Sequence, residues 1–183
     1  MRLESDPDVV KRLAEEREEE NWQFRSFLKG IDLKTEELDA IVHAHYEDVA
    51  NQIDCCACGN CCREVSAGLD DQDVLRLATG LDIEKDKFKK RFLTKDEDGE
   101  TIFRDLPCPF QSGNLCTVYD YRPETCRSFP HLHKDDFVFR LIGVVQNCSV
   151  CPIVFNVFER LKDELWHEWD DMWEVDRDRD EFV

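Results

Sequence analysis

At residues 55–62 the chain reads Cys-Cys-Ala-Cys-Gly-Asn-Cys-Cys, which places five cysteines within eight positions. Cys55, Cys58 and Cys61 are each separated by two residues, so a tight turn can bring successive sulfurs to one centre. Gly59 tolerates the positive φ angle that suits such a turn. Zinc knuckles and bacterial ferredoxin loops use the same spacing, which therefore predicts a thiolate metal site.

Five further cysteines follow, so the 183-residue chain holds ten. Cys108 and Cys151 each precede a proline, as does the cysteine that closes some iron–sulfur motifs. A turn over residues 111–114 is expected to bring Cys116 back towards Cys108, and Cys148 forms a second close pair with Cys151. Two other interpretations are weaker. Core cysteines would follow helix or strand periodicity, and a disulfide framework would need a secretory signal.

The composition restricts the partners and the compartment. The net charge is −18, with 36% charged and 42% hydrophobic residues, so nucleic acid and anionic membrane surfaces would be repelled. The first twenty residues lack the apolar core of a signal peptide, and no stretch is long and apolar enough to span a bilayer. We therefore expect a cytoplasmic protein, without nucleic-acid or membrane partners, whose thiols stay reduced.

Hydrophobic periodicity predicts a mainly α fold with a small β element around an irregular, loop-rich, metal-organised centre. Three regions are expected: a helical N-terminal extension (1–53), a cysteine-cluster metal-binding domain (54–152), and a C-terminal helix with an acidic tail (153–183). Helices are predicted over residues 6–29, 34–52, 70–80, 83–93 and 152–173. Strands are predicted at 137–142 and in a hairpin that turns at 95–99 and returns through 101–104.

Three blocks of sequence resemble a known family. They are residues 55–62, then Cys108-Pro109-Phe110 with Gly113 and Cys116, then Tyr119-x-x-Arg122-Pro123-x-x-Cys126-Arg127-x-Phe129-Pro130. In this order they are similar to the zinc- or iron-chelating CxxCxxCC proteins, also called YkgJ-like cysteine-cluster proteins, over about residues 55 to 152. The resemblance implies metal chelation by Cys55, Cys58, Cys61, Cys62, Cys108, Cys116 and Cys126.

With Cys148 and Cys151 the candidate ligands number nine, and Cys56 falls at a variable position of the motif. Adjacent side chains normally diverge, so Cys61 and Cys62 are expected to serve different metals, or one of them to bridge. The ligands suit two mononuclear sites, or one cluster plus one zinc, and thiolates alone do not separate zinc from an iron–sulfur cluster. His131 and His133 are open as further ligands. Arg122 and Arg127 flank Cys126 and could donate hydrogen bonds to sulfur or to carbonyl groups, or form surface salt bridges.

Three functions fit these residues. The first is a metal-binding module, the second an iron–sulfur oxidoreductase or electron carrier, and the third a metal-dependent transferase, because the resembled family includes relatives of flagellin lysine methylases. No phosphate loop, HExxH motif or nucleophile elbow decides whether the protein is an enzyme. Trp166, Trp169 and Trp173 share roughly one helical side, which suits a core, a protein partner or self-association.

Overall fold

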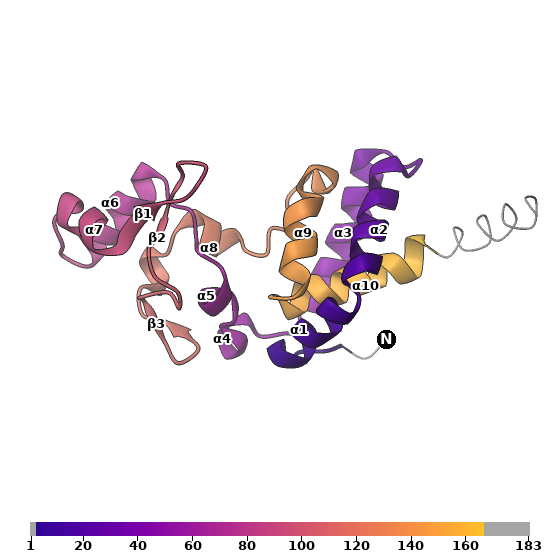
Figure 1. Cartoon of the computed structure of the whole chain (residues 1–183), viewed down its shortest axis with the longest axis horizontal. Coiled ribbons are helices and arrows are strands. Elements are labelled where there is room, and N and C mark those ends of the chain that lie inside the picture. Colours follow the sequence, from indigo (N-terminus) through magenta and orange to yellow (C-terminus); the bar gives the residue numbers. More distant parts are fainter. Residues whose placement is uncertain (1–2, 167–183) are drawn as a thin grey trace, which may run out of the picture. The chain divides into compact units, whose positions relative to one another are not determined.

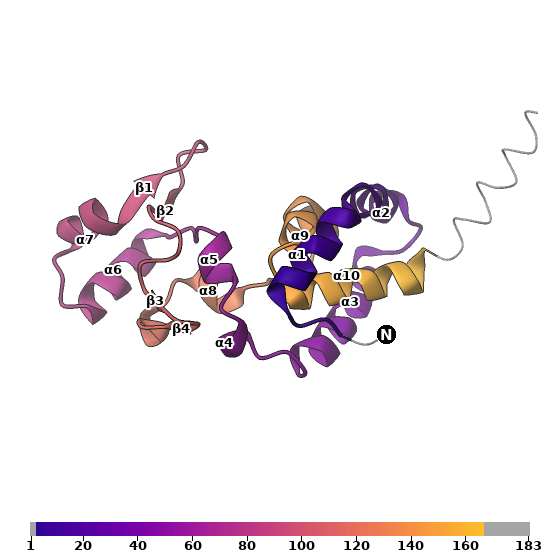
Figure 2. The same cartoon turned by 60° about the horizontal axis from the view of Figure 1, so that its bottom comes forward.

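The structure is a computed structural model that describes residues 3–166. The described residues form ten α-helices, two short 3-10 helices and two antiparallel sheets of two strands each (Figures 1 and 2). The predicted class, mainly α with a small β element, is confirmed. The chain divides into two compact units: unit 1 comprises residues 1–53 and 132–183, and unit 2 comprises residues 54–131.

Unit 1 is helical throughout its regular structure. In its described part the helices are α1 (Pro7–Glu16), α2 (Glu18–Gly30), α3 (Thr35–Ala50), the 3-10 helix η2 (Phe137–Arg140), α9 (Leu141–Cys148) and α10 (Pro152–Leu165). α10 packs against α3, α9 and α1. Its buried side chains include Phe155, Phe158 and Leu161, which join Phe24 and Val42 in the core. Unit 1 therefore has a hydrophobic core of its own.

The single helix predicted over residues 6–29 is wrong, because the helix breaks at Arg17. Arg17 has φ −108° and ψ 18°, and α2 restarts with three glutamates, residues 18–20, in its first turn. Glutamates are favoured at a helix N-terminus, whereas like charges repel within a continuous helix. Arg17 also pairs with the buried carboxylate of Glu159 on α10. The break at Arg17 therefore places the glutamates of residues 18–20 at a helix N-terminus, where negative charge is favourable.

The strand predicted over residues 137–142 is also wrong, because this segment forms η2 and the start of α9. The Asp39 carboxylate accepts hydrogen bonds from the backbone N–H groups of Asp136 (2.7 Å) and Phe137 (2.9 Å). Such bonds satisfy donors that a helix start leaves unpaired. Phe137 and Leu141 are both buried and four residues apart, a helical spacing that the almost continuous apolar run of residues 137–142 concealed.

Unit 2 alternates short helices with short strands. Its elements are α4 (Cys55–Cys58), α5 (Cys61–Glu64), α6 (Asp71–Gly80), α7 (Lys85–Phe92), β1 (Leu93–Lys95), β2 (Thr101–Phe103), β3 (Gln111–Ser112), β4 (Leu115–Cys116), the 3-10 helix η1 (Tyr119–Tyr121) and α8 (Glu124–Ser128). β1 pairs with β2, with Leu93 opposite Phe103. The predicted helices near 70–80 and 83–93 and the predicted hairpin are therefore confirmed.

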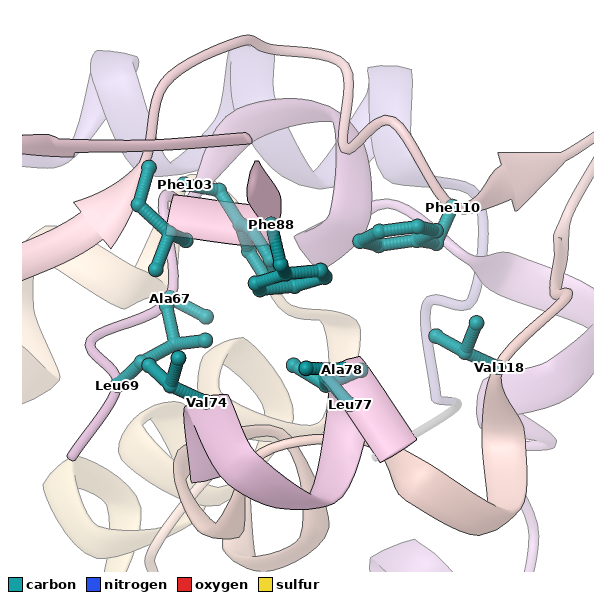
Figure 3. Packing of buried hydrophobic residues seen from close by; sticks show 10 residues of the cluster. Ala67, Leu69, Val74, Leu77, Ala78, Phe88, Phe103, Phe110 and Val118 are labelled. Atoms are coloured by element: carbon teal, nitrogen blue, oxygen red, sulfur yellow. The ribbon is translucent and has the colours of Figure 1, made fainter. Parts of the chain in front are cut away.

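The core of unit 2 is built on aromatic rings (Figure 3). Phe88 and Phe110 stack with their ring centroids 6.2 Å apart, and Phe103 meets Phe110 edge-on at 5.6 Å. Leu77 and Val74 of α6 are buried in the same cluster, against which Cys108, Cys116 and Cys126 also pack, partly buried. The hydrophobic core therefore holds three of the candidate ligands.

The predicted C-terminal helix is described only as far as Leu165. The Trp166 ring lies 5.3 Å from the Phe24 ring, centroid to centroid. Trp169 and Trp173 lie outside the described residues. Within residues 3–166 no single helix has the length and apolar character to cross a membrane. Residues 137–148 and 152–165 meet that criterion only as a pair, bent by 119°.

Candidate metal centre

The CxxCxxCC segment forms two single-turn helices joined at Gly59. The Asp54 carboxylate accepts a hydrogen bond from the Cys56 N–H (2.8 Å) and so caps α4. Gly59 ends α4 with φ 60°, and its N–H donates to the Cys55 carbonyl (3.0 Å). The positive φ expected at Gly59 is therefore present. Cys55 and Cys56 are exposed, whereas Cys58, Cys61 and Cys62 are half-buried.

Three polar side chains fix this segment to the β3–β4 hairpin. Asn114 donates to the Ala57 carbonyl (2.6 Å), and Gln111 donates to the Gly59 carbonyl (2.9 Å). Arg63 donates both to the Cys58 carbonyl (2.8 Å) and to the Asn114 side-chain carbonyl (2.9 Å). Three consecutive carbonyls, of residues 57–59, are thus held by Asn114, Arg63 and Gln111, which we call the hairpin clamp.

The second sequence block meets the first through the backbone, and the third packs against the same core as the second. The Cys108 N–H donates to the Cys62 carbonyl (2.7 Å), and the Gln111 N–H donates to the Cys108 carbonyl (3.0 Å). Cys116 lies on β4, opposite Gln111. The turn predicted at residues 111–114 is confirmed as the turn of this hairpin. Cys126 lies on α8 and packs against the same core.

The thiol pKa values show which of these cysteines interact. A hydrogen bond with Cys61, aided by Arg63 and Arg122, lowers the pKa of Cys62 to about 7 against the effect of burial. Burial raises the pKa of Cys108 to about 11 and that of Cys126 to about 12, and Cys62 adds to both increases. The pKa of Cys116 is raised by burial and again by Cys62.

The Cys62 carbonyl accepts the Cys108 N–H, so the first and second sequence blocks meet at Cys62. Adjacent side chains were expected to diverge, yet the Cys61 thiol hydrogen-bonds the Cys62 sulfur. Within residues 3–166, no group of three or more Cys, His, Asp or Glu side chains is already arranged to hold an ion. The thiols are therefore neighbours that still need to reorient in order to share a metal.

Cys148 and Cys151 lie in unit 1, apart from the other seven candidates. Both are buried, and the Cys148 thiol donates to the Val144 carbonyl (3.4 Å). Burial raises the pKa of Cys148 to about 12, although Lys162 opposes the shift. Their role as metal ligands stays a prediction.

The two histidines of interest fall in different units. The His131 ring nitrogen Nδ1 hydrogen-bonds the Ser128 hydroxyl (2.9 Å) in unit 2. The His133 ring lies 5.8 Å from the Tyr46 ring in unit 1, centroid to centroid. His131 has φ 65°, so the backbone is not extended at this residue.

The donor set fits zinc or iron. Thiolates bind both metals, and seven free cysteines lie in unit 2 besides Cys56. A buried nitrogen also lacks a partner there: Nε of Arg122 has no hydrogen-bond acceptor among the described residues. Leaving a buried donor unpaired is costly, so an acceptor that the described residues do not supply is expected beside it.

The family model CxxCxxCC, described as "Putative zinc- or iron-chelating domain", matches residues 54–152. The chain belongs to the CxxCxxCC family. The match covers all three cysteine blocks and continues through Cys148 and Cys151. No curated protein and no solved structure matches the chain. Family membership therefore supports metal chelation in general and leaves the metal open.

Sequence reasoning missed the hairpin clamp of this CxxCxxCC member. Asn114 was assigned only to a turn, and Arg63 received no role. Their contact joins positions 51 residues apart, a pairing that local pattern does not reveal. The closest signal was Gly59, because a glycine between cysteines marks a close backbone approach as well as a turn.

Proposed function

We propose that this chain is a cytoplasmic metal-binding protein that holds zinc or an iron–sulfur cluster through the thiolates of unit 2. The observation that carries the proposal is the gathering of cysteines from the three sequence blocks in unit 2. The Cys108 N–H donates to the Cys62 carbonyl (2.7 Å), and Cys108, Cys116 and Cys126 pack against one hydrophobic core. A reducing compartment keeps them available as ligands.

The proposed ligands come from Cys55, Cys58, Cys61, Cys62, Cys108, Cys116 and Cys126. Four of these complete a tetrahedral site, and the remainder allow a second metal or a bridge. The contact between Cys61 and Cys62 supports a bridging thiolate more than two distant sites. Cys148 and Cys151 are the weaker candidates, because both are buried in unit 1.

Metal binding supplies the energy that reorients the thiols. Bound thiolates replace neutral thiols, so binding releases protons and grows stronger as the pH rises. Burial has raised the pKa of Cys108 and Cys126, which makes their deprotonation without a metal unfavourable at neutral pH. A bound metal cation would lower the pKa of these thiols and so favour their deprotonated form.

Anaerobic purification followed by elemental and sulfide analysis tests the proposal. Stoichiometric metal in the wild-type chain is expected, and Cys62→Ser should lose most of it because it removes a proposed ligand whose pKa is lowered to about 7. Cys56→Ser is the matched control and should keep the metal, since Cys56 falls at a variable motif position. Wild-type protein without tightly bound metal would contradict the proposal.

The same analysis separates the functions that thiolates permit. Brown protein with iron and sulfide selects an electron carrier or oxidoreductase. Colourless protein with zinc selects a binding module or a metal-dependent transferase, in which zinc would activate a nucleophile. A single mononuclear ion per chain would refute the expectation of more than one metal.

A further inference from the structure

A pocket of unit 1 lies where α1, α2 and α9 meet (Figure 2). Its volume is about 380 Å³, within the range of about 300–1,000 Å³ that small-molecule sites occupy. The break at Arg17 brings the last turn of α1 and the first turns of α2 to this pocket. Glu18, Asn21 and Trp22 line it from one face of α2, because residues three and four apart lie on the same side of a helix.

The lining of the pocket combines apolar and acidic side chains. Ala14 of α1 and Val145 of α9 are buried and form its apolar part. Glu15 and Glu18, which we call the pocket carboxylates, are exposed and form its acidic part. No described residue with a basic side chain lines it. The pocket therefore has a net negative charge.

The pocket carboxylates lack the ion pairs that their neighbours in the acidic run make. Glu16 pairs with Arg12 (3.0 Å), and Glu20 pairs with Lys162 (2.7 Å). Among the described residues neither pocket carboxylate has an ion pair or a hydrogen-bonded side chain as a partner. Both are therefore free to pair with a positive group from outside the chain.

Asn21 adds a third acceptor to the pocket. The residue is only 3% exposed, and its Nδ2 donates to the Ala14 carbonyl (3.5 Å). Its Oδ1 is buried and accepts no hydrogen bond from the described residues. Leaving a buried acceptor unpaired is costly, so a donor that the described residues do not supply is expected beside it.

Trp22 supplies an aromatic ring at the same place. It is 37% exposed, and indole is the side-chain ring that attracts cations most strongly. The Arg25 guanidinium lies over this ring, 5.7 Å from its centroid, one turn further along α2 and outside the pocket lining. A cation in the pocket would share the ring with Arg25, and the two pocket carboxylates outweigh that single positive charge.

We propose that this pocket binds a guanidinium group, carried by a free small molecule or by an arginine side chain of another protein. A guanidinium presents five N–H donors in one plane. It can pair with the pocket carboxylates, donate to the Asn21 Oδ1 and stack on Trp22, while an alkyl stem packs on the apolar lining. The inference goes beyond the proposed function and does not depend on metal, because every residue of the pocket belongs to unit 1.

Isothermal titration calorimetry of the full chain with butylguanidinium tests the inference, and saturable binding is expected. Butylurea has nearly the same shape without the charge and should bind at least about tenfold more weakly. Butylammonium keeps the charge without the planar donors and should also bind more weakly. Glu18→Gln should weaken the binding of butylguanidinium about 10- to 100-fold, because it removes a charge-assisted hydrogen bond.

Glu19→Gln is the matched control for Glu18→Gln. It removes the same charge from the same turn of α2, but Glu19 accepts from Gln23 (3.4 Å) and does not line the pocket. Its affinity should therefore stay close to that of the wild type. Trp22→Leu should lose about two- to fivefold in affinity, which corresponds to an exposed cation–π contact. In NMR spectra the Asn21 side-chain amide resonances should shift on binding, since a donor to Oδ1 polarises the amide.

A peptide with one arginine between alanines distinguishes the two sources of the group. Tighter binding of the peptide than of butylguanidinium supports an arginine side chain, and weaker binding supports a free small molecule. Three results would overturn the inference: no saturable binding of either probe, equal binding of butylurea or butylammonium, or equal losses in Glu18→Gln and Glu19→Gln. Metal analysis of the same preparation reports separately on the proposed function.

Discussion

Cys62 differs from the thiols around it in both charge and position. The Cys61 hydrogen bond, with Arg63 and Arg122, lowers its pKa to about 7, whereas burial raises that of Cys126 to about 12. At neutral pH the metal-free chain therefore holds one substantially ionised thiol among neutral neighbours. Such a thiolate is the natural first ligand for an incoming metal ion.

This difference predicts selective alkylation. In reduced, metal-free protein at pH 7.5, iodoacetamide should label Cys62 at least about tenfold faster than Cys126, because the thiolate is the reactive form. The Cys62 rate should rise with pH through a midpoint near 7, since the ionised fraction grows as pH increases. Peptide mass spectrometry over a time course measures both rates. Equal labelling of the two cysteines would contradict the pKa assignment.

Gly59 is required by space as well as by its backbone conformation. A Cβ at this position would lie 2.7 Å from the Asn114 carbonyl oxygen, on a backbone with φ +60°. Gly113 has a similar φ of +61° but nothing within 4 Å of its would-be Cβ. Comparing alanine variants of Gly59 and Gly113 therefore separates two contributions to the free energy of unfolding: the positive φ angle, which both share, and the collision with Asn114, which occurs only at Gly59.

Gly59→Ala should therefore destabilise unit 2 more than Gly113→Ala. The positive φ alone costs about 1–2 kcal/mol in either variant, and the collision adds to the cost at Gly59. Urea unfolding of the metal-free variants, followed by amide hydrogen exchange across residues 54–131, measures the difference. An equal loss of unfolding free energy in both variants would contradict the close approach of the β3–β4 hairpin to Gly59.

At the scale of elements, the hairpin clamp is what joins the β3–β4 hairpin to the CxxCxxCC turn. Asn114 donates to Ala57 and accepts from Arg63. Asn114→Ala should cost about 1–3 kcal/mol of unfolding free energy, because it leaves polar groups without partners. Gln52→Ala is the control, since the side-chain amide of the exposed Gln52, just after α3, hydrogen-bonds only Asp48 within that helix.

The coupling between Arg63 and Asn114 gives a stricter measurement. A double-mutant cycle of Arg63→Ala and Asn114→Ala should show an interaction energy of about 0.5–3 kcal/mol. Purely additive effects would mean that the two side chains act separately and that no clamp exists.

Local signals predicted some elements well and others badly. α6 was predicted with its cap because Asp70 and Gly80 bracket an apolar helical pattern, and Asp70 does accept the Asp73 N–H (2.7 Å). Residues 137–142 misled because they form a short, almost continuous apolar run between Asp136 and Gly143, which resembles a strand. What makes them helical is the Asp39 carboxylate, 97 and 98 residues away in sequence. A capping partner at that distance leaves no local trace.

For the whole molecule, the sequence indicated cysteine chemistry over residues 54–152, which is also the span that the family model matches. The packing of the chain groups residues 132–152 with the N-terminal helices in unit 1. The three predicted regions stay a prediction. This grouping depends on buried contacts of Leu132, Phe137 and Leu141 with other helices. Because such contacts join distant residues, periodicity alone could not place Cys148 and Cys151 in a different unit from the other candidate ligands.

The two units should respond differently to metal removal. Unit 2 has short elements and few long helices, so bound metal should contribute strongly to its order. Chelation under reducing conditions should raise amide hydrogen exchange across residues 54–131, while α3 and α10, which have their own core, keep their protection. Mass spectrometry after proteolysis locates the change, and reloading with metal is the control. Unchanged protection in unit 2 would contradict a structural role for the metal.

X-ray absorption at the metal edge tests the central claim most directly, because it reports the atoms bound to the ion. For the metal-loaded wild-type chain the account predicts a first shell dominated by sulfur, with distances of about 2.3 Å if the metal is zinc. Cys62→Ser should lose sulfur from this shell or lose the metal. A shell of oxygen and nitrogen atoms would show that the thiols of unit 2 do not form the metal centre.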